Sequence, residues 1–379
     1  MQVPFSDLSA QYLEARSEID AAWQDVVTRS AFIGGEPVKR FETELAASFG
    51  LKYACGVASG TAALAITLRS FGLGPEDEVI TTVHTAAPTA EAITLAGARI
   101  VFCDIEEETF EIDPAAVEAA ITPRTRVLLP VHLYGLSARL KELLAIARKH
   151  NLILLEDCAQ AQGTLYDGRP VGTFGVAGCL SFFPSKNLGG FGDGGAVVTN
   201  DEKIERFVRM YSNHGRLSKF DHTIQGANER LDALQAALML PKLRRLEQWN
   251  ERKRQAAEWY RRRLSDIEEV RLPHPVPECT PTWHLFVVRI ADRDDLARLL
   301  KERGVSTGLH YPLPLNLQPA FESLSKPAGS FPVAERLTQR EILSLPMFPH
   351  IAEEQVDYVC RQIREYVTAH LRKTRMAAP

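Results

Sequence analysis

Short apolar runs alternate with helix-forming segments through most of the first half of the chain, and this alternation limits the folds available to it. The apolar runs lie at 78–83, 99–103, 127–131 and 152–155, and the helix-forming segments lie between them at 89–96, 114–120 and 139–150. Strands that are connected through helices run parallel in one sheet, which the helices cover on both faces. The pattern therefore predicts an α/β fold with a mostly parallel sheet. Ligands on such sheets bind beyond the carboxyl ends of the strands.

The length of 379 residues exceeds what one ordinary hydrophobic core supports, so we expect two units. The composition changes near residue 245. We expect a long helix that begins at 226 and is kinked at Pro241. After it come a proline-rich stretch at 273–281, a strand at 285–290, and helices at 294–302 and 353–368. We predict a large domain over 1–245, including an N-terminal lead-in, and a small C-terminal α+β domain over 246–379.

Composition argues against several classes of function. The net charge of −4 and the pI near 6.2 disfavour non-specific binding to nucleic acids or anionic membranes. The six cysteines form no CxxC pair and no cluster with histidines, which disfavours a disulfide framework or a metal site and favours reduced thiols. The first 20 residues lack the pattern of a signal peptide, and no apolar run approaches the roughly 18 residues that span a bilayer. We therefore expect a soluble cytoplasmic protein.

A lysine follows a buried strand in the middle of the chain. The apolar run at 179–183 ends at Pro184, and Lys186 stands two residues later among small residues and glycines. A lysine held near the interior loses part of its hydration, which lowers its pKa and makes the amine nucleophilic. A lysine that forms a Schiff base needs this property. The alternative is an ordinary solvated loop lysine.

A turn of small residues follows another apolar run. Ser59-Gly60-Thr61 leads directly into a strongly helix-forming segment. Such a turn presents free backbone N–H groups at the positive end of a helix, which together bind phosphate. The alternative is a simple N-cap made by Ser59 or Thr61. The spacing matches neither a Walker A loop nor GxGxxG.

A carboxylate stands where the strand at 152–155 ends. Asp157 is expected to be buried there, which is costly unless a cation pairs with it. Its partner could be a protonated ring nitrogen, and Gln160 could donate to an oxygen on the same ring. The alternative is that Asp157 caps the next helix. The residues alone leave both readings open.

Motifs spread along the chain match one family in the same order. They are Ser59-Gly60-Thr61, Glu156-Asp157-x-Ala159-Gln160, Ser181-Phe182-Phe183-Pro184-Ser185-Lys186, Gly192-Asp193-Gly194-Gly195, Asn228-x-Arg230-Leu231-Asp232 and His310-Tyr311-Pro312. Through this ordered set, nearly the whole chain resembles the DegT/DnrJ/EryC1/StrS aminotransferases, which are sugar aminotransferases that use pyridoxal 5′-phosphate (PLP). The resemblance implies the fold-type I PLP-transferase architecture, in which a large domain with a mostly parallel sheet is joined to a smaller α+β C-terminal domain.

The resemblance also implies a catalytic set. Lys186 would hold PLP as a Schiff base and, once released, would move a proton between the cofactor carbon and the substrate carbon. Asp157 would keep the pyridine nitrogen protonated, so that the ring can act as an electron sink. Gln160 would bond the ring hydroxyl.

The remaining cofactor contacts are implied in the same way. The phosphate would be bound by the backbone of Gly60, Thr61 and Ala62 and by the hydroxyl of Ser181. In the family, an asparagine at the position of Asn228 reaches the phosphate of the neighbouring subunit's cofactor. The resemblance therefore implies a homodimer with shared active sites.

Substrate contacts are implied at His84, Arg230, His310 and Tyr311, with two departures from the family pattern. Many members carry Thr-Phe or Thr-Trp, with the aromatic residue stacked on the PLP ring, where this chain has Thr85-Ala86. The stack would be missing or supplied by a neighbour such as His84. Asn316 stands where many relatives have histidine.

The implied function is transfer of an amino group, from L-glutamate, to a keto sugar linked to dTDP or UDP. The cofactor would alternate between PLP and pyridoxamine 5′-phosphate. The sequence around Lys186 and the His-Tyr-Pro stretch resemble those of enzymes that aminate C3. Transamination of a keto-cyclitol is an alternative, and so is a regulatory PLP-binding protein without turnover. A Rossmann-type oxidoreductase is disfavoured because no glycine fingerprint follows the first strand.

Overall fold

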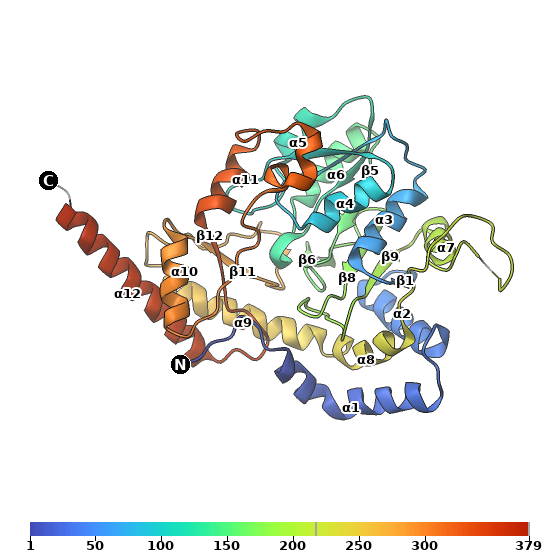
Figure 1. Ribbon diagram of the computed structural model, residues 1–379, viewed down its shortest axis with the longest axis horizontal. Helices are drawn as coiled ribbons and strands as arrows, with labels where there is room; N and C mark the ends of the chain where they lie inside the picture. Colours follow the sequence, from blue (N-terminus) through green and yellow to red (C-terminus); the bar gives the residue numbers. More distant parts are fainter. Residues whose placement is uncertain (217, 378–379) are drawn as a thin grey trace.

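The structure is a computed structural model that describes residues 1–216 and 218–377, with side chains described as far as residue 369. Its centre is a seven-stranded sheet in the order β1-β9-β8-β5-β4-β2-β3 (Figure 1). The strands are β1 (Tyr53–Val57), β2 (Glu78–Thr82), β3 (Arg99–Cys103), β4 (Thr125–Leu129), β5 (Ile153–Asp157), β8 (Ala177–Ser181) and β9 (Gly195–Thr199). All neighbouring pairs are parallel except those of β9, which runs antiparallel to both β1 and β8. The prediction of a mostly parallel sheet is confirmed.

Helices cover both faces of this sheet. One face carries α3 (Gly60–Ser70), α4 (Ala87–Leu95) and α7 (Glu202–Tyr211), and the other carries α2 (Gly35–Phe49), α5 (Pro114–Ala120), α6 (Leu140–Lys149) and α8 (Ala233–Leu243). Successive strand residues alternate between the two cores: Val79 packs with α3 and α4, whereas Ile80 packs on the opposite face. Burial on both faces explains why the strands read as continuous apolar runs in the sequence.

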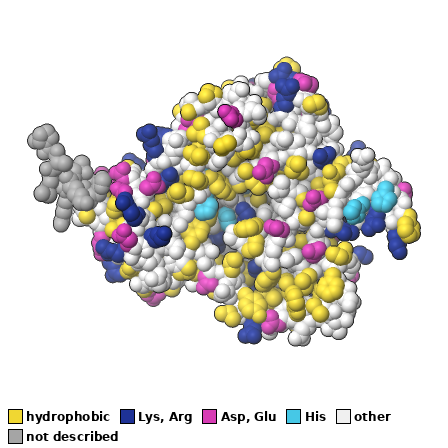
Figure 2. Space-filling view, in the orientation of Figure 1, with side chains coloured by type: hydrophobic (Ala, Val, Ile, Leu, Met, Phe, Trp, Pro, Cys, Tyr) yellow, Lys and Arg dark blue, Asp and Glu magenta, His cyan; other side chains and the backbone are white. Residues whose placement is uncertain are grey.

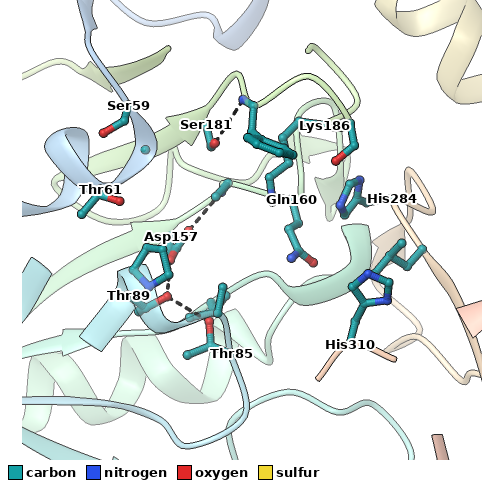
Figure 3. Close-up of a pocket in the computed structure, with 18 of the residues that line it drawn as sticks. Ser59, Thr61, Thr85, Thr89, Asp157, Gln160, Ser181, Lys186, His284 and His310 are labelled. Carbon is teal, nitrogen blue, oxygen red and sulfur yellow. Dashed lines mark hydrogen bonds between the residues drawn. The ribbon is translucent and has the colours of Figure 1, made fainter. Parts of the chain in front are cut away.

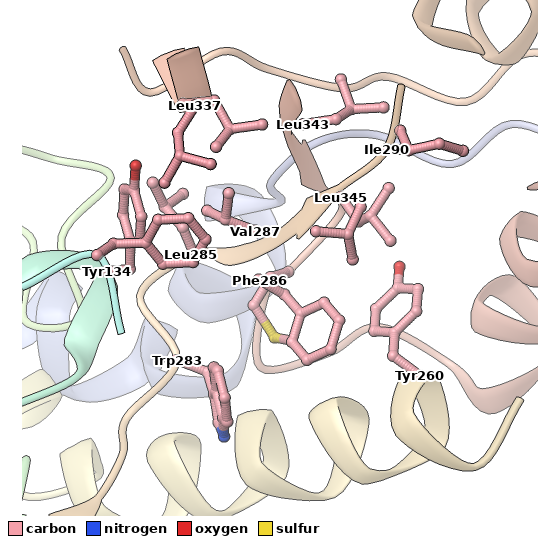
Figure 4. Close-up of a cluster of buried hydrophobic side chains, with 14 of the residues drawn as sticks. Tyr134, Tyr260, Trp283, Leu285, Phe286, Val287, Ile290, Leu337, Leu343 and Leu345 are labelled. Atoms are coloured by element: carbon pink, nitrogen blue, oxygen red, sulfur yellow. The ribbon is translucent and has the colours of Figure 1, made fainter. Parts of the chain in front are cut away.

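The C-terminal unit packs helices against a two-stranded antiparallel sheet. Its elements are α9 (Leu246–Leu264), β11 (Phe286–Arg289), α10 (Arg293–Glu302), α11 (Pro332–Arg336), β12 (Ile342–Leu345) and α12 (Glu353–Ala377). A separate small sheet joins β10 (Cys279–Thr280) to β6 (Leu165–Tyr166) and β7 (Arg169–Pro170). Phe286 stacks on Tyr260 at 4.9 Å between ring centroids (Figure 4). The same buried cluster includes Tyr134 from the sheet-bearing part of the chain. We propose the domain division at residue 245, between α8 and α9.

The long helix expected from residue 226 is wrong in its start and in the position of its break. Residues 228–232 are extended, because Arg230 pairs with Val57 and Asp232 pairs with Ile33. Pro241 lies inside α8, where burial of the apolar helix offsets the loss of one backbone donor. The break falls three residues later, between α8 and α9.

The N-terminal residues attach to the C-terminal unit before α1 (Leu8–Thr28) begins. Val3 pairs with Val305, and the Met347 N–H donates to the Phe5 carbonyl at 3.3 Å. The lead-in therefore belongs to the wall between the two units instead of trailing away from them. Among the described residues, no helix combines the length and the apolar character that crossing a bilayer requires.

Candidate active site

A cavity of about 530 Å³ opens at the carboxyl ends of β5 and β8 (Figure 3). Asp157 is the last residue of β5 and Ser181 is the last residue of β8. The N-terminus of α3, the start of α4 and the segment around His310 complete the walls. Both its size and its position at the strand ends are typical of a small-molecule site on a parallel sheet.

Lys186 reaches this cavity from a tightly closed turn. Its N–H donates to the Phe183 carbonyl at 2.8 Å, and Gly189 packs so closely that a Cβ there would lie 2.0 Å from the Pro184 carbonyl oxygen. Removal from water lowers the pKa of Lys186 to about 8, although the nearby Asp157 carboxylate acts in the opposite direction. The solvated-lysine alternative predicts no such shift. A lowered pKa increases the share of neutral, nucleophilic amine.

Asp157 is buried at the floor of the cavity, with one hydrogen bond to each carboxylate oxygen. The Ala159 N–H donates to Oδ1 at 3.0 Å, and the Thr89 hydroxyl donates to Oδ2 at 2.8 Å. The Thr85 hydroxyl lies 2.9 Å from that of Thr89, and since Thr89 gives its only proton to Asp157, Thr85 is the donor in this pair. Burial raises the pKa of Asp157, and the charge of Lys186 counteracts the rise. A cation facing this carboxylate would keep it ionised.

The neighbouring Glu156 points into a different network that fixes the end of β5. Its carboxylate accepts hydrogen bonds from the N–H groups of Gly172, Phe174 and Gly175 at 2.7–2.8 Å. It also lies 3.0 Å from Nε2 of His132, whose Nδ1 accepts from the Ala138 N–H. Glu156 therefore anchors the strand end from behind, while Asp157 faces the cavity.

The turn before α3 has the form expected of a phosphate site. Within the described residues, the N–H groups of Gly60 and Thr61 make no hydrogen bond, whereas the Ala62 N–H already donates to Ser59 Oγ at 3.0 Å. Both Gly60 and Thr61 line the cavity, and Gly60 lies directly beside Ser181. A Cβ on Gly60 would lie 2.7 Å from Ser181 Cβ, so only glycine fits there. Of the predicted backbone donors, Gly60 and Thr61 remain available and Ala62 is occupied.

Gln160 and Tyr311 form the side of the cavity next to the C-terminal unit. The Tyr134 N–H donates to Gln160 Oε1 at 2.8 Å, and this fixes the orientation of the amide. Gln160 Nε2 donates to the Tyr311 hydroxyl at 3.1 Å, which leaves its second hydrogen available to a ligand. His310 stacks on Phe5, and its Nδ1 lies 2.9 Å from Ser344 Oγ. Burial lowers the pKa of His310 to about 4, so the ring is neutral.

Four predicted residues do not line the cavity of their own chain: Ala62, His84, Asn228 and Arg230. His84 is 1% exposed and lies behind the wall, where its Nε2 is 2.6 Å from the Tyr134 hydroxyl, so its predicted contact with substrate is corrected to a supporting position. The hydroxyl of Tyr134 donates to the His310 carbonyl. Asn228 is exposed, and Arg230 Nη1 donates to Asn213 Oδ1 at 3.2 Å. Neither Asn228 nor Arg230 lines the cavity of its own chain.

Several lining residues escaped the sequence analysis. They are Phe5 and Ser6 from the lead-in, Pro88 and Thr89 from α4, and His284, Leu285 and Met347 from the C-terminal unit. Ala86 and Pro88 line the region where the family pattern places an aromatic ring, and His84 does not. The rule that ligands bind beyond the carboxyl ends of parallel strands (the strand-end rule) selects residues that follow strands. These side chains belong to other segments, so the rule does not select them.

The donor set fits PLP. Lys186 offers a nucleophilic amine to an aldehyde, Asp157 offers a buried anion to a pyridinium nitrogen, and Gly60 and Thr61 offer free N–H groups to a phosphate. These three groups line one cavity. Gln160 Nε2 keeps one hydrogen for a ring hydroxyl.

Comparisons with known proteins agree with this set. The family model described as the DegT/DnrJ/EryC1/StrS aminotransferase family matches residues 14–364. A pleiotropic regulatory protein of Geobacillus stearothermophilus is 44% identical over 97% of this chain and 99% of its own length. A dTDP-3-amino-3,4,6-trideoxy-alpha-D-glucose transaminase of Streptomyces venezuelae is 43% identical over 96% of each chain. The crystal structure of S. venezuelae DesV in complex with a ketimine intermediate superposes with a TM-score of 0.94, at 43% identity over 97% of this chain and 98% of that chain.

Proposed function

The chain belongs to the DegT/DnrJ/EryC1/StrS aminotransferase family and is a PLP-dependent sugar aminotransferase, and we propose that it transfers an amino group from L-glutamate to the C3 keto group of a dTDP- or UDP-linked sugar. The observation that carries the proposal is the single cavity in which the Lys186 amine, the Asp157 carboxylate and the free N–H groups of Gly60 and Thr61 face one another. The preference for C3 rests on the relative whose name specifies a 3-amino sugar. We also propose that the protein works in the cytoplasm.

When bound, PLP supplies an aldehyde for the lysine and a ring that delocalises negative charge from the reacting carbon. Lys186 Nζ would bind the aldehyde and, when displaced by the substrate amine, would remain beside the reacting carbon as a base. Its pKa of about 8 suits this task, because general bases act best when their pKa lies near the working pH. Asp157 would hold a proton on the ring nitrogen through its buried charge.

Proton transfer by Lys186 requires that water be kept away from the reacting carbon. Phe5, His310 and Tyr311 close the cavity on the side of the C-terminal unit, and Phe5 reaches it from the N-terminal lead-in. The pKa of Tyr311 is raised to about 12 by burial, so its hydroxyl stays protonated. We propose that His310 and Tyr311 contact the substrate and that Gln160 orients the ring hydroxyl of the cofactor.

We propose that the active form is a homodimer that shares its two sites. Two large hydrophobic side chains of helix α1 are exposed to solvent: Leu13 at 62% and Trp23 at 50%. Figure 2 shows many hydrophobic side chains over the part of the surface that carries α1 and α8. An apolar surface of this kind is typical of a protein interface. The exposed Asn228 and the neighbouring Arg230 lie outside their own cavity, as residues that serve a partner's site would.

The visible absorption spectrum tests the proposed function. We expect the purified protein to carry a yellow band that bleaches when L-glutamate is added without sugar, and to recover the band when a dTDP- or UDP-linked 3-keto sugar is added. A band that ignores glutamate would reject glutamate as the donor. Recovery with a keto-cyclitol, and with neither nucleotide sugar, would replace the proposed acceptor.

Substituting Asn228→Ala tests the shared site. We expect the cofactor to bind about tenfold more weakly, because the phosphate loses one hydrogen bond from the partner subunit. PLP affinity is measured by fluorescence titration of the apoenzyme. The matched control is Asn200→Ala, an exposed asparagine away from the cavity whose side chain accepts from the Lys52 N–H at 2.9 Å. Unchanged PLP affinity in Asn228→Ala, with the dimer intact by light scattering, would contradict the shared site.

A further inference from the structure

A histidine from the C-terminal unit faces the cavity near Lys186. His284 lies just before β11 and lines the cavity together with Lys186 and His310, and Figure 3 shows its ring between these two side chains. It is 7% exposed. Nothing in the sequence around it suggested a role at the site. Its chemical role depends on which of its two ring nitrogens carries the proton.

Asn187, which directly follows the catalytic lysine, settles that question because its own orientation is fixed. Asn187 Nδ2 lies 3.2 Å from the Thr282 carbonyl and 2.9 Å from Asn250 Oδ1. A carbonyl oxygen accepts and never donates, so the atom that faces Thr282 must be the amide nitrogen. Asn250 is fixed in turn, because its Nδ2 donates to the Gln162 carbonyl at 3.0 Å.

The other end of the Asn187 amide is therefore an acceptor. Lys253 Nζ donates to Asn187 Oδ1 at 3.0 Å. Burial lowers the pKa of Lys253 to about 7, but its Nζ carries hydrogens to donate in either protonation state. Both neighbours of the amide thus assign Oδ1 to the same position.

The tautomer of His284 follows from this position. His284 Nδ1 lies 3.2 Å from Asn187 Oδ1, and an acceptor oxygen requires that Nδ1 carry a hydrogen. Burial, with the charges of Lys186 and Lys253, lowers the pKa of His284 well below its usual range, so the ring carries only one proton. Nε2, on the edge of the ring away from Asn187, is left with a free lone pair.

A free lone pair in this wall selects for a ligand that donates a hydrogen. Carboxylates of glutamate accept hydrogen bonds and would be repelled by it, and the amino group of glutamate must go to the reacting carbon beside Lys186. A sugar ring carries hydroxyl groups next to the keto carbon, and each of these can donate. We propose that His284 Nε2 accepts a hydrogen bond from a hydroxyl of the keto sugar, and that Asn187 and Lys253 are positioning residues that hold the tautomer required. This assignment deepens the proposed function and rests on it.

Two substitutions of His284 distinguish the roles of its two ring nitrogens. The amide oxygen of His284→Gln reaches about as far as Nε2 and can still accept, whereas His284→Asn reaches only about as far as Nδ1. The two half reactions are followed separately by single-turnover absorbance. L-glutamate is the probe of the first half reaction. A dTDP-linked 3-amino hexose is the probe of the second, which it follows in the reverse direction. For His284→Asn we expect kcat/KM with the amino sugar to fall about tenfold more than kcat/KM with glutamate, and for His284→Gln we expect most of this difference to disappear. His150→Gln, at a half-buried histidine that lies 2.9 Å from Glu118 Oε1 on α5, is the matched control.

The tautomer is measured independently in the holoenzyme. The ¹⁵N shifts of the His284 ring, assigned by comparison with His284→Gln, should show a protonated Nδ1 and a bare Nε2. A protonated Nε2, or equal losses in the two half reactions of His284→Asn, would overturn the assignment. If the wild-type protein reacts with glutamate but not with the amino sugar, the proposed function fails, and the assignment of His284 to a sugar hydroxyl fails with it. A wild-type reaction with both probes and equal losses in His284→Asn rejects the assignment alone.

Discussion

Replacing Lys186 with alanine is expected to lower turnover by at least about 10³-fold, because one side chain supplies both the covalent attachment and the proton transfer. The visible band that depends on the lysine should be lost, while PLP should still bind through Gly60, Thr61 and Asp157. Turnover is measured with L-glutamate and the nucleotide sugar, and cofactor retention is measured separately after dialysis.

Lys186→Arg is the matched variant for this test. Arginine keeps the positive charge beside Asp157, but its guanidinium cannot lose a proton at ordinary pH. We therefore expect Lys186→Arg to be as inactive as Lys186→Ala, and added methylamine to restore part of the activity only in the alanine variant, where it can occupy the vacated space. Wild-type turnover in either variant would show that another group carries the amine chemistry.

The parallel sheet could be predicted because its strands are buried on both faces and are separated by helices. The direction of β9 could not be predicted from its composition, since an apolar run has no direction. A usable signal was present: the 13 residues between Ser181 and Gly195 contain no helix, and the crossover between two parallel strands usually contains one. The position of the helix break after Pro241 depended on tertiary burial, which local propensity does not report.

The candidate site divides in the same way. Asp157 ends β5, and the turn at Gly60 and Thr61 lies just beyond the end of β1, so both stand where ligands bind on a parallel sheet. The family motifs add Lys186 and Gln160. His284 lies 98 residues after Lys186 in the chain, and Phe5 lies 181 residues before it. Both line the same cavity, so their positions depend on how the two units pack. His84 stands two residues after the end of β2, yet its ring lies against Tyr134 and does not line the cavity. A strand end therefore indicates a neighbourhood, and packing decides which side chains enter it.

The electrostatic role of Asp157 leads to the second large effect, in Asp157→Asn. Asparagine has nearly the same shape but no charge. Its amide oxygen can accept, but its amide nitrogen cannot, so one of the two hydrogen bonds that the carboxylate receives from Ala159 and Thr89 is lost. Removing one partner of a buried charged pair costs about 3–5 kcal/mol, so we expect turnover to fall by about 10²–10⁴-fold. Single-turnover rates with L-glutamate measure this loss, at saturating PLP.

Thr89→Val separates the charge of Asp157 from its support. Valine removes the hydroxyl that donates to Asp157 Oδ2 but leaves the carboxylate in place, so we expect a loss of only about tenfold or less. If the carboxylate of Asp157 keeps the ring nitrogen protonated, turnover by Asp157→Asn must be far slower than turnover by Thr89→Val, with PLP bound in both variants. If the two variants were equally slow, Asp157 would act through position alone, and the charge at the floor of the cavity would have no part in the reaction.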